Sequence, residues 1–442
     1  MSAAKNSLLS VDAHTKKRNA AEKRFKAYGL SAIIIAMLAL AVLLTSVLST
    51  GLNAFRQTYI TIEVPLPETK LDKSGVRDID VMKKVTTIGY NPLLRDGLLV
   101  AIEAAGITTE LSNKDIGKLI SKEAPATVRN HVLANPDVIG GSMTFNLLAS
   151  GRIDGYFKGR VTMESAALDG NTSPEALQLA QDLKDAGLIQ TRFNWHFIFA
   201  PDASDQRPEA AGLGVAILGS LYMMTVVLVL ALPLGVAASI YLEEFSPKNR
   251  WTDLIEVNIS NLAAVPSIVY GILGLAIFIN FMEFNQSSPL VGGLVLTLMT
   301  LPTIIISTRA SLKSVPPSIR DAALGVGASK MQSVFHHVLP LAAPGILTGT
   351  IIGLAQALGE TAPLLLIGMV AFVREYPAAY SADAGLFGEA STALPVQVFN
   401  WTQRADPGFV ERASGAIITL LVFLLIMNTI AIILRRKFER RW

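Results

Sequence analysis

A single carboxylate stands in a long stretch of the chain that carries no other charge. Glu360 is the one charged residue in residues 338–373, with Gln356 four positions before it and Thr361 directly after it. An ionised carboxylate inside a bilayer is costly, so it usually faces a partner group or a water-filled path. Glu360 is therefore either a protonated or paired carboxylate that braces neighbouring helices, or a residue on the path of a polar solute.

A second candidate site lies in residues 315–340, where the residue types suit contact with another protein. A proline pair precedes Ser318 and Asp321, whose capping-box spacing predicts the start of a short helix. Small residues leave one surface with little side-chain bulk: Ala322, Ala323, Gly325, Gly327 and Ala328. Gly327 allows a turn into a second helical piece, which Pro340 is expected to end. The segment is either a plain surface helix or a site on which another protein's groove closes.

The rest of the chain gives little support for catalysis. Its 442 residues include no cysteine, which excludes disulfides, thiolate metal sites and cysteine nucleophiles. A phosphate-binding loop needs Gly-x4-Gly-Lys-Ser/Thr, and the segment Gly117-Lys118-Leu119 fails at both ends of that pattern. His131 and His196 lack a neighbouring carboxylate pattern and are interpreted as structural. We expect no cofactor, no bound metal and no ATP hydrolysis by this chain.

The composition indicates a membrane protein. Hydrophobic residues make up 51% of the chain and charged residues 17%, whereas soluble chains carry about 25% charged residues. Six uncharged runs are long enough to cross a hydrocarbon core of about 30 Å: residues 30–48, 213–242, 259–282, 284–308, 338–359 and 413–434. The first run exceeds the apolar region of a cleaved signal, so we expect a retained helix.

Residues 49–212 have the composition of a soluble domain between the first two spans. Ser173 followed by Pro174 predicts a helix through Lys184 that Gly187 ends. Residues 191–199 alternate weakly, as a strand does. We expect a small mixed α/β fold.

The distribution of Lys and Arg predicts the orientation. These residues concentrate near both termini and in the connections that follow the second and fourth spans, whereas the opposite short connections hold only Arg374, Arg404 and Arg412. Both termini should then face the cytoplasm. The predicted parts are a basic cytoplasmic segment (1–29), a transmembrane helix (30–48), an extracytoplasmic domain (49–212), a transmembrane domain (213–434) and a basic cytoplasmic tail (435–442). The predicted fold class is an all-α integral membrane bundle of six transmembrane helices with an inserted soluble α/β extracytoplasmic domain.

The second candidate segment resembles the coupling-helix motif of ABC importer permeases. The motif is matched by the spacing of Asp321-Ala322-Ala323, Gly327 and Leu339-Pro340. Two residues differ from the motif: Asp321 stands where Glu is usual, and His337 stands where Ile is preferred. The resemblance implies an importer-permease bundle with a coupling helix at about 318–337, on which two copies of a cytoplasmic ATPase act. The residues that it places at the ATPase contact are Asp321, Ala322, Ala323, Gly327, Leu339 and Pro340.

The first candidate segment narrows the family. Gly-Glu-Thr-Ala-Pro-Leu-Leu at residues 359–365, after Gly-Ile-x-Thr-Gly at 345–349, resembles phosphate-importer permeases of the PstA type, in an extended form with an extra extracytoplasmic domain. The resemblance covers residues 213–434. It implies phosphate as substrate, a second phosphate permease subunit, an extracytoplasmic phosphate-binding protein, and an inner (plasma) membrane location among membrane lipid. The extra domain is expected to contact the binding protein or the second permease.

The expected residues of the translocation path are Glu360, Thr361, Gln356 and Arg309. Glu360 would repel phosphate directly, so we expect it to pair with a basic residue and to set when the path opens. This family commonly has Arg where the chain has Gln356. The positive charge must therefore come from the second permease or from Arg309.

Three alternatives stay open. The coupling motif does not encode substrate, so another oxyanion such as molybdate or sulfate also fits. A membrane sensor with an outward ligand domain would need a cytoplasmic output domain, and no predicted cytoplasmic segment is long enough. A secondary transporter should show two similar halves and several intramembrane acids, which the sequence lacks.

Overall fold

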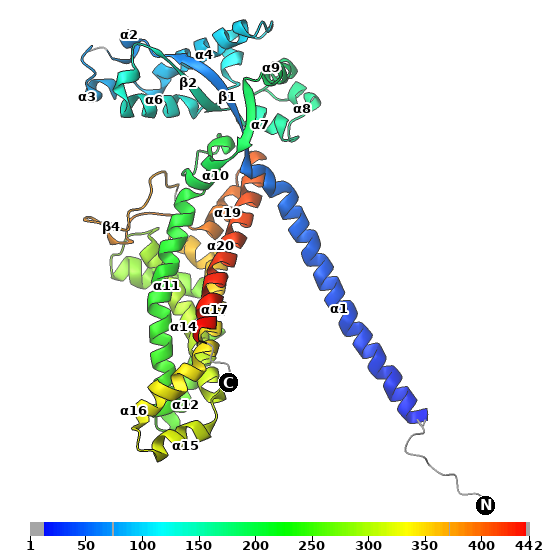
Figure 1. Cartoon of the computed structure of the whole chain (residues 1–442), viewed down its shortest axis with the longest axis vertical. Helices are drawn as coiled ribbons and strands as arrows, with labels where there is room; N and C mark the ends of the chain where they lie inside the picture. The colour runs from blue at the N-terminus through cyan, green and yellow to red at the C-terminus, as the bar shows by residue number, and fades with distance from the viewer. Residues whose placement is uncertain (1–12, 73–74, 371, 439–442) are drawn as a thin grey trace, which may run out of the picture.

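The computed structural model describes residues 13–72, 75–370 and 372–438, and Figure 1 shows three parts. A sheet domain lies at one end of a helical bundle, and a long helix, α1 (Ala13–Gly51), diverges from that bundle. The predictions for residues 1–12 and 439–442 lie outside the described residues. The fold class predicted from the sequence, a helical membrane bundle with an added sheet-containing domain, is confirmed.

The sheet domain contains three antiparallel strands in the order β2-β1-β3. Its strands are β1 (Arg56–Pro65), β2 (Ser142–Leu148) and β3 (Ile189–Phe193). Its helices are α2 (Glu68–Leu71), α3 (Ile79–Met82), α4 (Thr87–Ala104), α5 (Asn113–Gly117), α6 (Ala124–Ala134), α7 (Gly151–Phe157), α8 (Met163–Ala167), α9 (Pro174–Asp185) and α10 (Trp195–Phe199). Ile60, Ile62 and Val64 of β1 are buried with residues of α4, α6 and α9 in one core.

The helix predicted in this domain is confirmed, and the strand predicted after it is wrong in part. Ser173 Oγ accepts a hydrogen bond from the Ala176 N–H at 3.3 Å, and Gly187 follows the helix at φ +81°. The strand ends at Phe193. Asn194 Oδ1 then accepts the Phe197 N–H at 3.0 Å, and this N-cap starts α10 where the alternating pattern favoured a strand.

The bundle is built around three long helices, α11 (Gly214–Ile240), α14 (Pro289–Ser314) and α17 (Leu339–Gly359), which pack against one another. Its helices are α11 (Gly214–Ile240), α12 (Arg250–Ala263), α13 (Ser267–Gly274), α14 (Pro289–Ser314), α15 (Pro317–Gly325), α16 (Lys330–Ser333), α17 (Leu339–Gly359), α18 (Ala362–Leu366), α19 (Leu394–Thr402) and α20 (Gly408–Phe438), with a hairpin of β4 (Tyr380–Ser381) and β5 (Gly385–Leu386). Gly345 and Gly349 of α17 face Ser311 and Ser307 of α14 so closely that an added Cβ would overlap each serine. Such small-residue pairs let the helix backbones approach within a membrane.

Five helices of the described part are long and apolar enough to cross a membrane, and the bent pair α12 and α13 makes a sixth if it forms one span. That pair corrects the predicted run at 259–282. Residues 259–263 belong to α12, and the chain bends by 100° before α13. Pro266 N-caps α13, and proline disfavours helical backbone in the residue before it.

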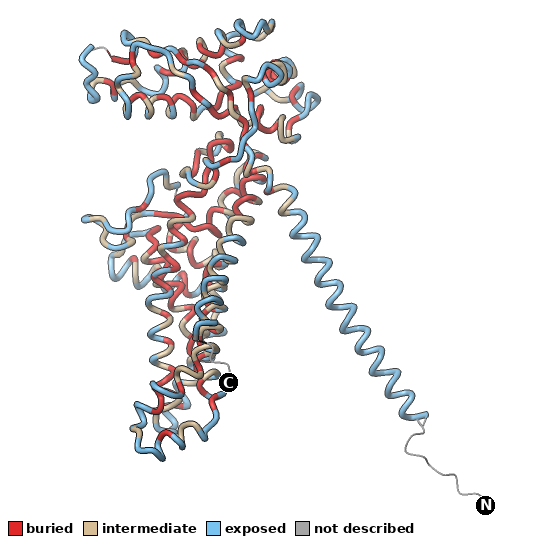
Figure 2. Tube along the Cα trace, viewed as in Figure 1, coloured by how far each residue is buried: buried red, intermediate tan, exposed pale blue. Residues whose placement is uncertain are grey.

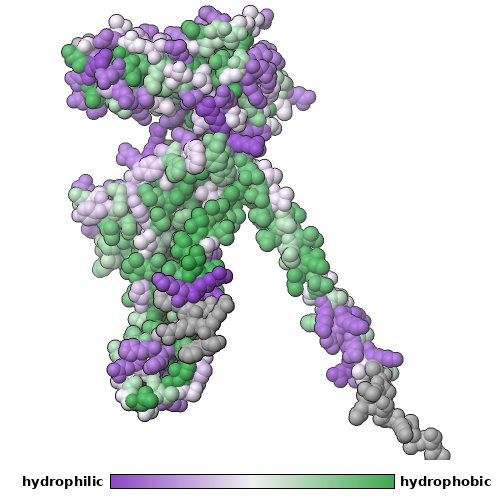
Figure 3. Space-filling model, in the orientation of Figure 1, coloured by the Kyte–Doolittle hydropathy of each residue, from purple (hydrophilic) through white to green (hydrophobic). Residues whose placement is uncertain are grey.

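Much of the apolar surface is uncovered by the chain itself. Within the described residues, the apolar windows of α1 and α20 contain no buried residue. Figure 2 shows α1 as an almost wholly exposed helix, and Figure 3 shows hydrophobic residues on the part of α1 nearer the bundle and on the visible face of the bundle. The last residue of α1, Gly51, packs on Ser414 and Ile418 of α20. These surfaces suit lipid or another membrane subunit.

Candidate functional site

The helix predicted from the proline pair is present, but its cap differs from the prediction. Pro316 is the N-cap of α15, and no side chain caps that end. Ser318 lies inside the first turn, so the capping box predicted for Ser318 and Asp321 is wrong. A capping box starts α16 instead, where Ser329 Oγ accepts the Gln332 N–H at 3.3 Å and Gln332 Oε1 accepts the Ser329 N–H at 2.9 Å.

Gly327 makes the turn between α15 and α16, as the sequence indicates. Its φ of +89° lies in the left-handed region that glycine adopts readily. The Ala328 N–H donates to the Ala323 carbonyl and the Gly327 N–H to the Leu324 carbonyl, both at 3.0 Å. These two bonds form a Schellman motif that ends α15.

Pro340 does not end the second helical piece, contrary to the sequence prediction. A π-helical turn, Val334–Val338, joins α16 to α17, and the Leu339 N–H donates to the Val334 carbonyl. Pro340 then occupies the first turn of α17, which continues to Gly359. Proline is tolerated there because the wider turn before it already replaces the regular bonding pattern.

The short helices α15 and α16 project from the end of the bundle opposite the sheet domain, which we call the α15 end (Figure 1). Asp321, Ala322 and Gly327 are exposed there, as an ATPase contact would require. Ala323 instead is 6% exposed and belongs to the buried side of α15. Leu339 and Pro340 are half-buried in the first turn of α17.

Two apolar residues beside the predicted contact are also exposed. Leu324 is 48% and Val326 is 87% exposed. Because α15 is short, the sequence pattern does not indicate which of its sides is exposed. The exposure of Leu324 and Val326 was therefore not predicted. They add hydrophobic area to a surface otherwise formed by small side chains, which suits a protein partner.

An ion pair that sequence reasoning missed holds α15 on the bundle. Arg320 Nη2 donates to Glu244 Oε1 at 2.6 Å, and Glu244 lies in the π-helical turn Tyr241–Phe245 that follows α11. The same guanidinium donates to the Val315 carbonyl at 2.8 Å and the Leu312 carbonyl at 2.9 Å, at the end of α14. One arginine therefore joins α15 to both α11 and α14.

Three of the four residues predicted for a translocation path lie at or near a break between two helices. Glu360 follows the last residue of α17, and Thr361 is the N-cap of α18. Glu360 is half-buried, and its side chain has no hydrogen-bond or ion-pair partner among the described residues. Gln356 is exposed on the last turns of α17.

Arg309 lies far from these residues. Its guanidinium pairs with Glu256 at 2.6 Å and with Glu243 at 3.5 Å. Ser307 and Ser311 flank Arg309 on α14 and contact residues 345–349 of α17, so Arg309 lies about 20 Å along the helix axis from Glu360. Arg309 therefore does not supply the positive charge beside Glu360.

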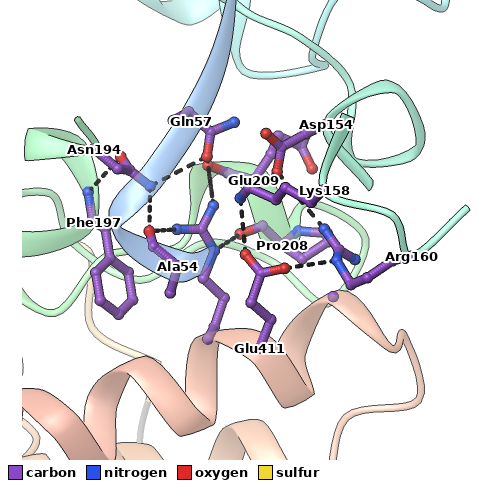
Figure 4. Close-up of polar contacts among 12 residues, drawn as sticks. Ala54, Gln57, Asp154, Lys158, Arg160, Asn194, Phe197, Pro208, Glu209 and Glu411 are labelled. Carbon is purple, nitrogen blue, oxygen red and sulfur yellow. Dashed lines mark hydrogen bonds and ion pairs between the residues drawn. The ribbon is translucent and has the colours of Figure 1, made fainter. Parts of the chain in front are cut away.

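A buried polar cluster that the sequence did not reveal joins the sheet domain to α20 (Figure 4). Arg412 of α20 is 2% exposed and donates to four acceptors. They are the Pro208 carbonyl at 2.9 Å, Gln57 Oε1 at 2.7 Å, and the carbonyls of Ala54 and Glu209, both at 3.2 Å. The side chain thus ties α20 to the start of β1 and to the connection before α11.

The residue that precedes Arg412 in α20 extends the cluster into the sheet domain. Glu411 pairs with Lys158 Nζ at 2.8 Å and with Arg160 Nε at 2.6 Å. Lys158 also contacts Asp154 at 2.6 Å, and the Asp154 carboxylate accepts the Thr58 N–H at 3.0 Å. Burial lowers the pKa of Lys158, and the Asp154 carboxylate opposes that shift.

Two other titratable groups lie at the same junction. Burial raises the pKa of Glu209, although Ser121 Oγ donates to its carboxylate at 2.6 Å and opposes the shift. Burial lowers the pKa of His196, whose Nε2 lies 3.0 Å from the Ala210 carbonyl. Among the described residues, no three His, Asp or Glu side chains lie close enough together to hold a metal ion, and His196 and Glu209 are no exception.

The apolar helices, with two short helices displayed at one end, are those of a membrane-spanning bundle. Residues 231–442 match the family described as binding-protein-dependent transport system inner membrane component. Residues 12–167 match a domain of unknown function, DUF3333.

Curated relatives agree with the family match. A probable ABC transporter permease protein, YqgI of Bacillus subtilis, is 31% identical over 53% of this chain and 81% of its own length. The phosphate transport system permease protein PstA of Mycobacterium leprae is 32% identical over 57% of this chain and 79% of its own length. PstA 1 of Mycobacterium tuberculosis is 31% identical over 52% of this chain and 73% of its own length. An inward-facing MetNI methionine ABC transporter has a TM-score of 0.38 at 14% identity, covering 52% of this chain and 95% of that one.

The chain belongs to this family of ABC importer permeases and is a multi-pass inner-membrane protein. Its relatives among the phosphate transport permeases confirm the PstA-type resemblance, and the added match at 12–167 agrees with the extended form.

Proposed function

We propose that the chain is the transmembrane permease subunit of an ATP-driven phosphate importer. It forms the translocation path with a second permease subunit and is driven by a cytoplasmic ATPase dimer. The observation that carries the coupling role is the exposed α15 surface at Asp321, Ala322 and Gly327, which Arg320 holds to two long helices. The names of the relatives support phosphate as the substrate.

We infer that the α15 end faces the cytoplasm and the sheet domain faces outward. Lys313 lies at the end of α14, Arg320 lies within α15, and Lys330 begins α16, while Arg435 and Arg436 lie near the end of α20. A surplus of basic residues in short connections is typical of the cytoplasmic side. Both termini then lie in the cytoplasm, and a phosphate-binding protein would approach from the side of the sheet domain.

In the proposed cycle, closure of the ATPase dimer displaces α15. The Arg320 contacts pass this displacement to α11 and α14, and the continuous helix from α16 to α17 passes it toward Glu360. Rigid elements joined in this way can switch a bundle between outward and inward access. This chain hydrolyses no ATP itself in this scheme.

Glu360 would act where α17 and α18 separate. Its carboxylate is half-buried without a partner among the described residues, so it can pair with a basic residue of the second permease. Such a pair would open and close with the path, because the phosphate anion competes with Glu360 for the same positive charge. The exposed sides of α1 and α20 offer that second subunit its packing surface.

The coupling surface is tested by adding bulk at Gly325. A Cβ at Gly325 meets nothing within 4 Å, and its φ is not in the left-handed region, so Gly325→Trp changes the surface without straining α15. Gly327→Trp is less clean because φ there is +89°. The matched control is Gly170→Trp in the sheet domain, where an added Cβ also meets nothing.

Phosphate uptake by cells and co-purification of the ATPase would be measured at equal membrane levels of each variant. We expect Gly325→Trp to lose uptake and ATPase binding, and Gly170→Trp to keep both. Full uptake and normal ATPase binding by Gly325→Trp would show that α15 is not the contact.

A further inference from the structure

Three aromatic side chains form an exposed patch at the base of the sheet domain. The outer aromatic patch consists of Phe193, Trp195 and Phe199, which are 49%, 62% and 63% exposed. The ring centroids of Phe193 and Trp195 lie 4.8 Å apart, and those of Trp195 and Phe199 lie 5.9 Å apart. Exposed large rings that contact one another are unusual on a surface that faces water.

The patch lies level with the outer ends of the membrane helices. On the opposite side of α10, Phe197 is fully buried, and its ring lies against Gly415, inside the uncharged run of α20. The Phe199 carbonyl lies against Gly214, the first residue of α11. Because α10 is only five residues long, its exposed rings lie within a few ångströms of this level.

The end of α1 marks the same level from another direction. Gly51 packs on Ser414 and Ile418 of α20, and the ring of Phe55, just beyond it, stacks with Phe193 at 6.3 Å. Three membrane helices therefore end around α10. The outer aromatic patch continues their apolar surface toward the sheet domain.

Neighbouring charges favour a headgroup environment for the patch. Arg56 is the direct cross-strand partner of Phe193, and Arg192 precedes Phe193 on β3. Both arginines are exposed. Aromatic rings at the height of the headgroups, beside cationic side chains that reach lipid phosphates, are characteristic of a membrane interface.

We propose that the outer aromatic patch is a lipid-binding surface that lies in the headgroup region of the outer leaflet. Trp195 and Phe199 enter the interface, while Phe197 fixes α10 to the bundle. The contact holds the base of the sheet domain against the membrane, so that the domain keeps one orientation relative to the path. This inference requires a membrane-spanning bundle, rests on the proposed orientation for the choice of leaflet, and is independent of the transported substrate.

The absence of native cysteine makes a direct test straightforward. Trp195→Cys and Phe199→Cys would each be labelled with an environment-sensitive fluorophore, in the full chain with its partner subunits in lipid nanodiscs. Leu168→Cys is the matched control, because Leu168 is an apolar residue of the same domain that is 92% exposed. Emission would be quenched in parallel by nitroxide lipids, labelled at the headgroup or the upper acyl chain, and by aqueous iodide.

We expect both patch positions to show blue-shifted emission, strong loss of emission with nitroxide lipids and weak loss with iodide. Leu168→Cys should show the reverse. If iodide quenches the patch labels and nitroxide lipids do not, the patch faces water and the proposal is overturned. If neither quencher reaches them, a protein subunit covers the patch, and the lipid assignment is equally overturned.

Discussion

Arg320 and Glu244 connect α15 to the end of α11 through a 2.6 Å ion pair, and the arginine also binds two carbonyls at the end of α14. The Arg320 side chain is 22% exposed and the Glu244 side chain 8%. A planar guanidinium can make all these bonds at once, whereas an ammonium group cannot. The pair is therefore positioned to transmit movement of α15 to the bundle.

Arg320→Ala should loosen α15 and separate ATP hydrolysis from transport. Glu244 would keep a largely buried charge without its partner, at a cost of about 3 kcal/mol. We expect phosphate uptake to fall while the purified complex still hydrolyses ATP. Arg320→Lys should recover little, because lysine cannot reach Glu244, Leu312 and Val315 together.

Lys313→Ala is the control for this experiment. Lys313 is 57% exposed and lies 3.5 Å from Glu243, so its loss should leave uptake unchanged. Equal effects of Arg320→Ala and Lys313→Ala would show that the Glu244 contact has no special role.

Lys158→Met should destabilise the junction between the sheet domain and α20. The Lys158 side chain is 3% exposed between Asp154 and Glu411, and removing it leaves Arg160 as the one ion-pair partner of these two buried carboxylates among the described residues. We expect a loss on the order of 3 kcal/mol, measured as earlier proteolysis of the sheet domain on heating.

A second substitution checks the electrostatic cause of that loss. Lys158→Met combined with Glu411→Gln should be more stable than Lys158→Met alone, because one unpaired charge is removed. Lys83→Met is the surface control, since the Lys83 and Asp80 side chains are 58% and 87% exposed. The account fails if the double substitution is no more stable than the single one.

His196 should make the junction less stable in acid. Burial lowers its pKa in the folded chain, so the unfolded chain binds more protons just below the ordinary value of about 6.5. Stability is then present above that value and is lost as pH falls toward the lowered pKa. The melting temperature should drop between about pH 7.5 and 5.5.

The comparison with His196→Gln isolates this contribution. Burial raises the pKa of Glu209, which acts in the opposite direction, but this effect is common to both proteins. The difference in melting temperature between wild type and His196→Gln should shrink as the pH is lowered. A difference that is constant with pH would exclude His196 as the titrating group.

Local patterns were enough to predict the long helices and the turn at Gly327. An uncharged run of sufficient length and a glycine between two helical pieces are properties of neighbouring residues. The bend before α13 and the passage of α17 through Pro340 were not predicted. Both depend on π-helical turns or helix breaks that the hydrophobic pattern does not encode.

The polar contacts that hold the site together could not be predicted from the sequence. Arg320 is 76 residues from Glu244, and Lys158 is 253 residues from Glu411. Each residue taken alone resembles an ordinary charge at the end of a helix. Their pairing follows from how α11, α14 and α20 pack, which no single segment specifies.

The central claim is tested most directly by uptake of labelled phosphate in cells that lack this chain but keep its partner subunits. We predict that the wild-type chain restores phosphate uptake, and that excess sulfate or molybdate does not compete. Restoration of sulfate or molybdate uptake in place of phosphate uptake would contradict the proposed substrate. Failure to restore uptake of any of the three anions, with normal membrane levels and partners present, would contradict the importer itself.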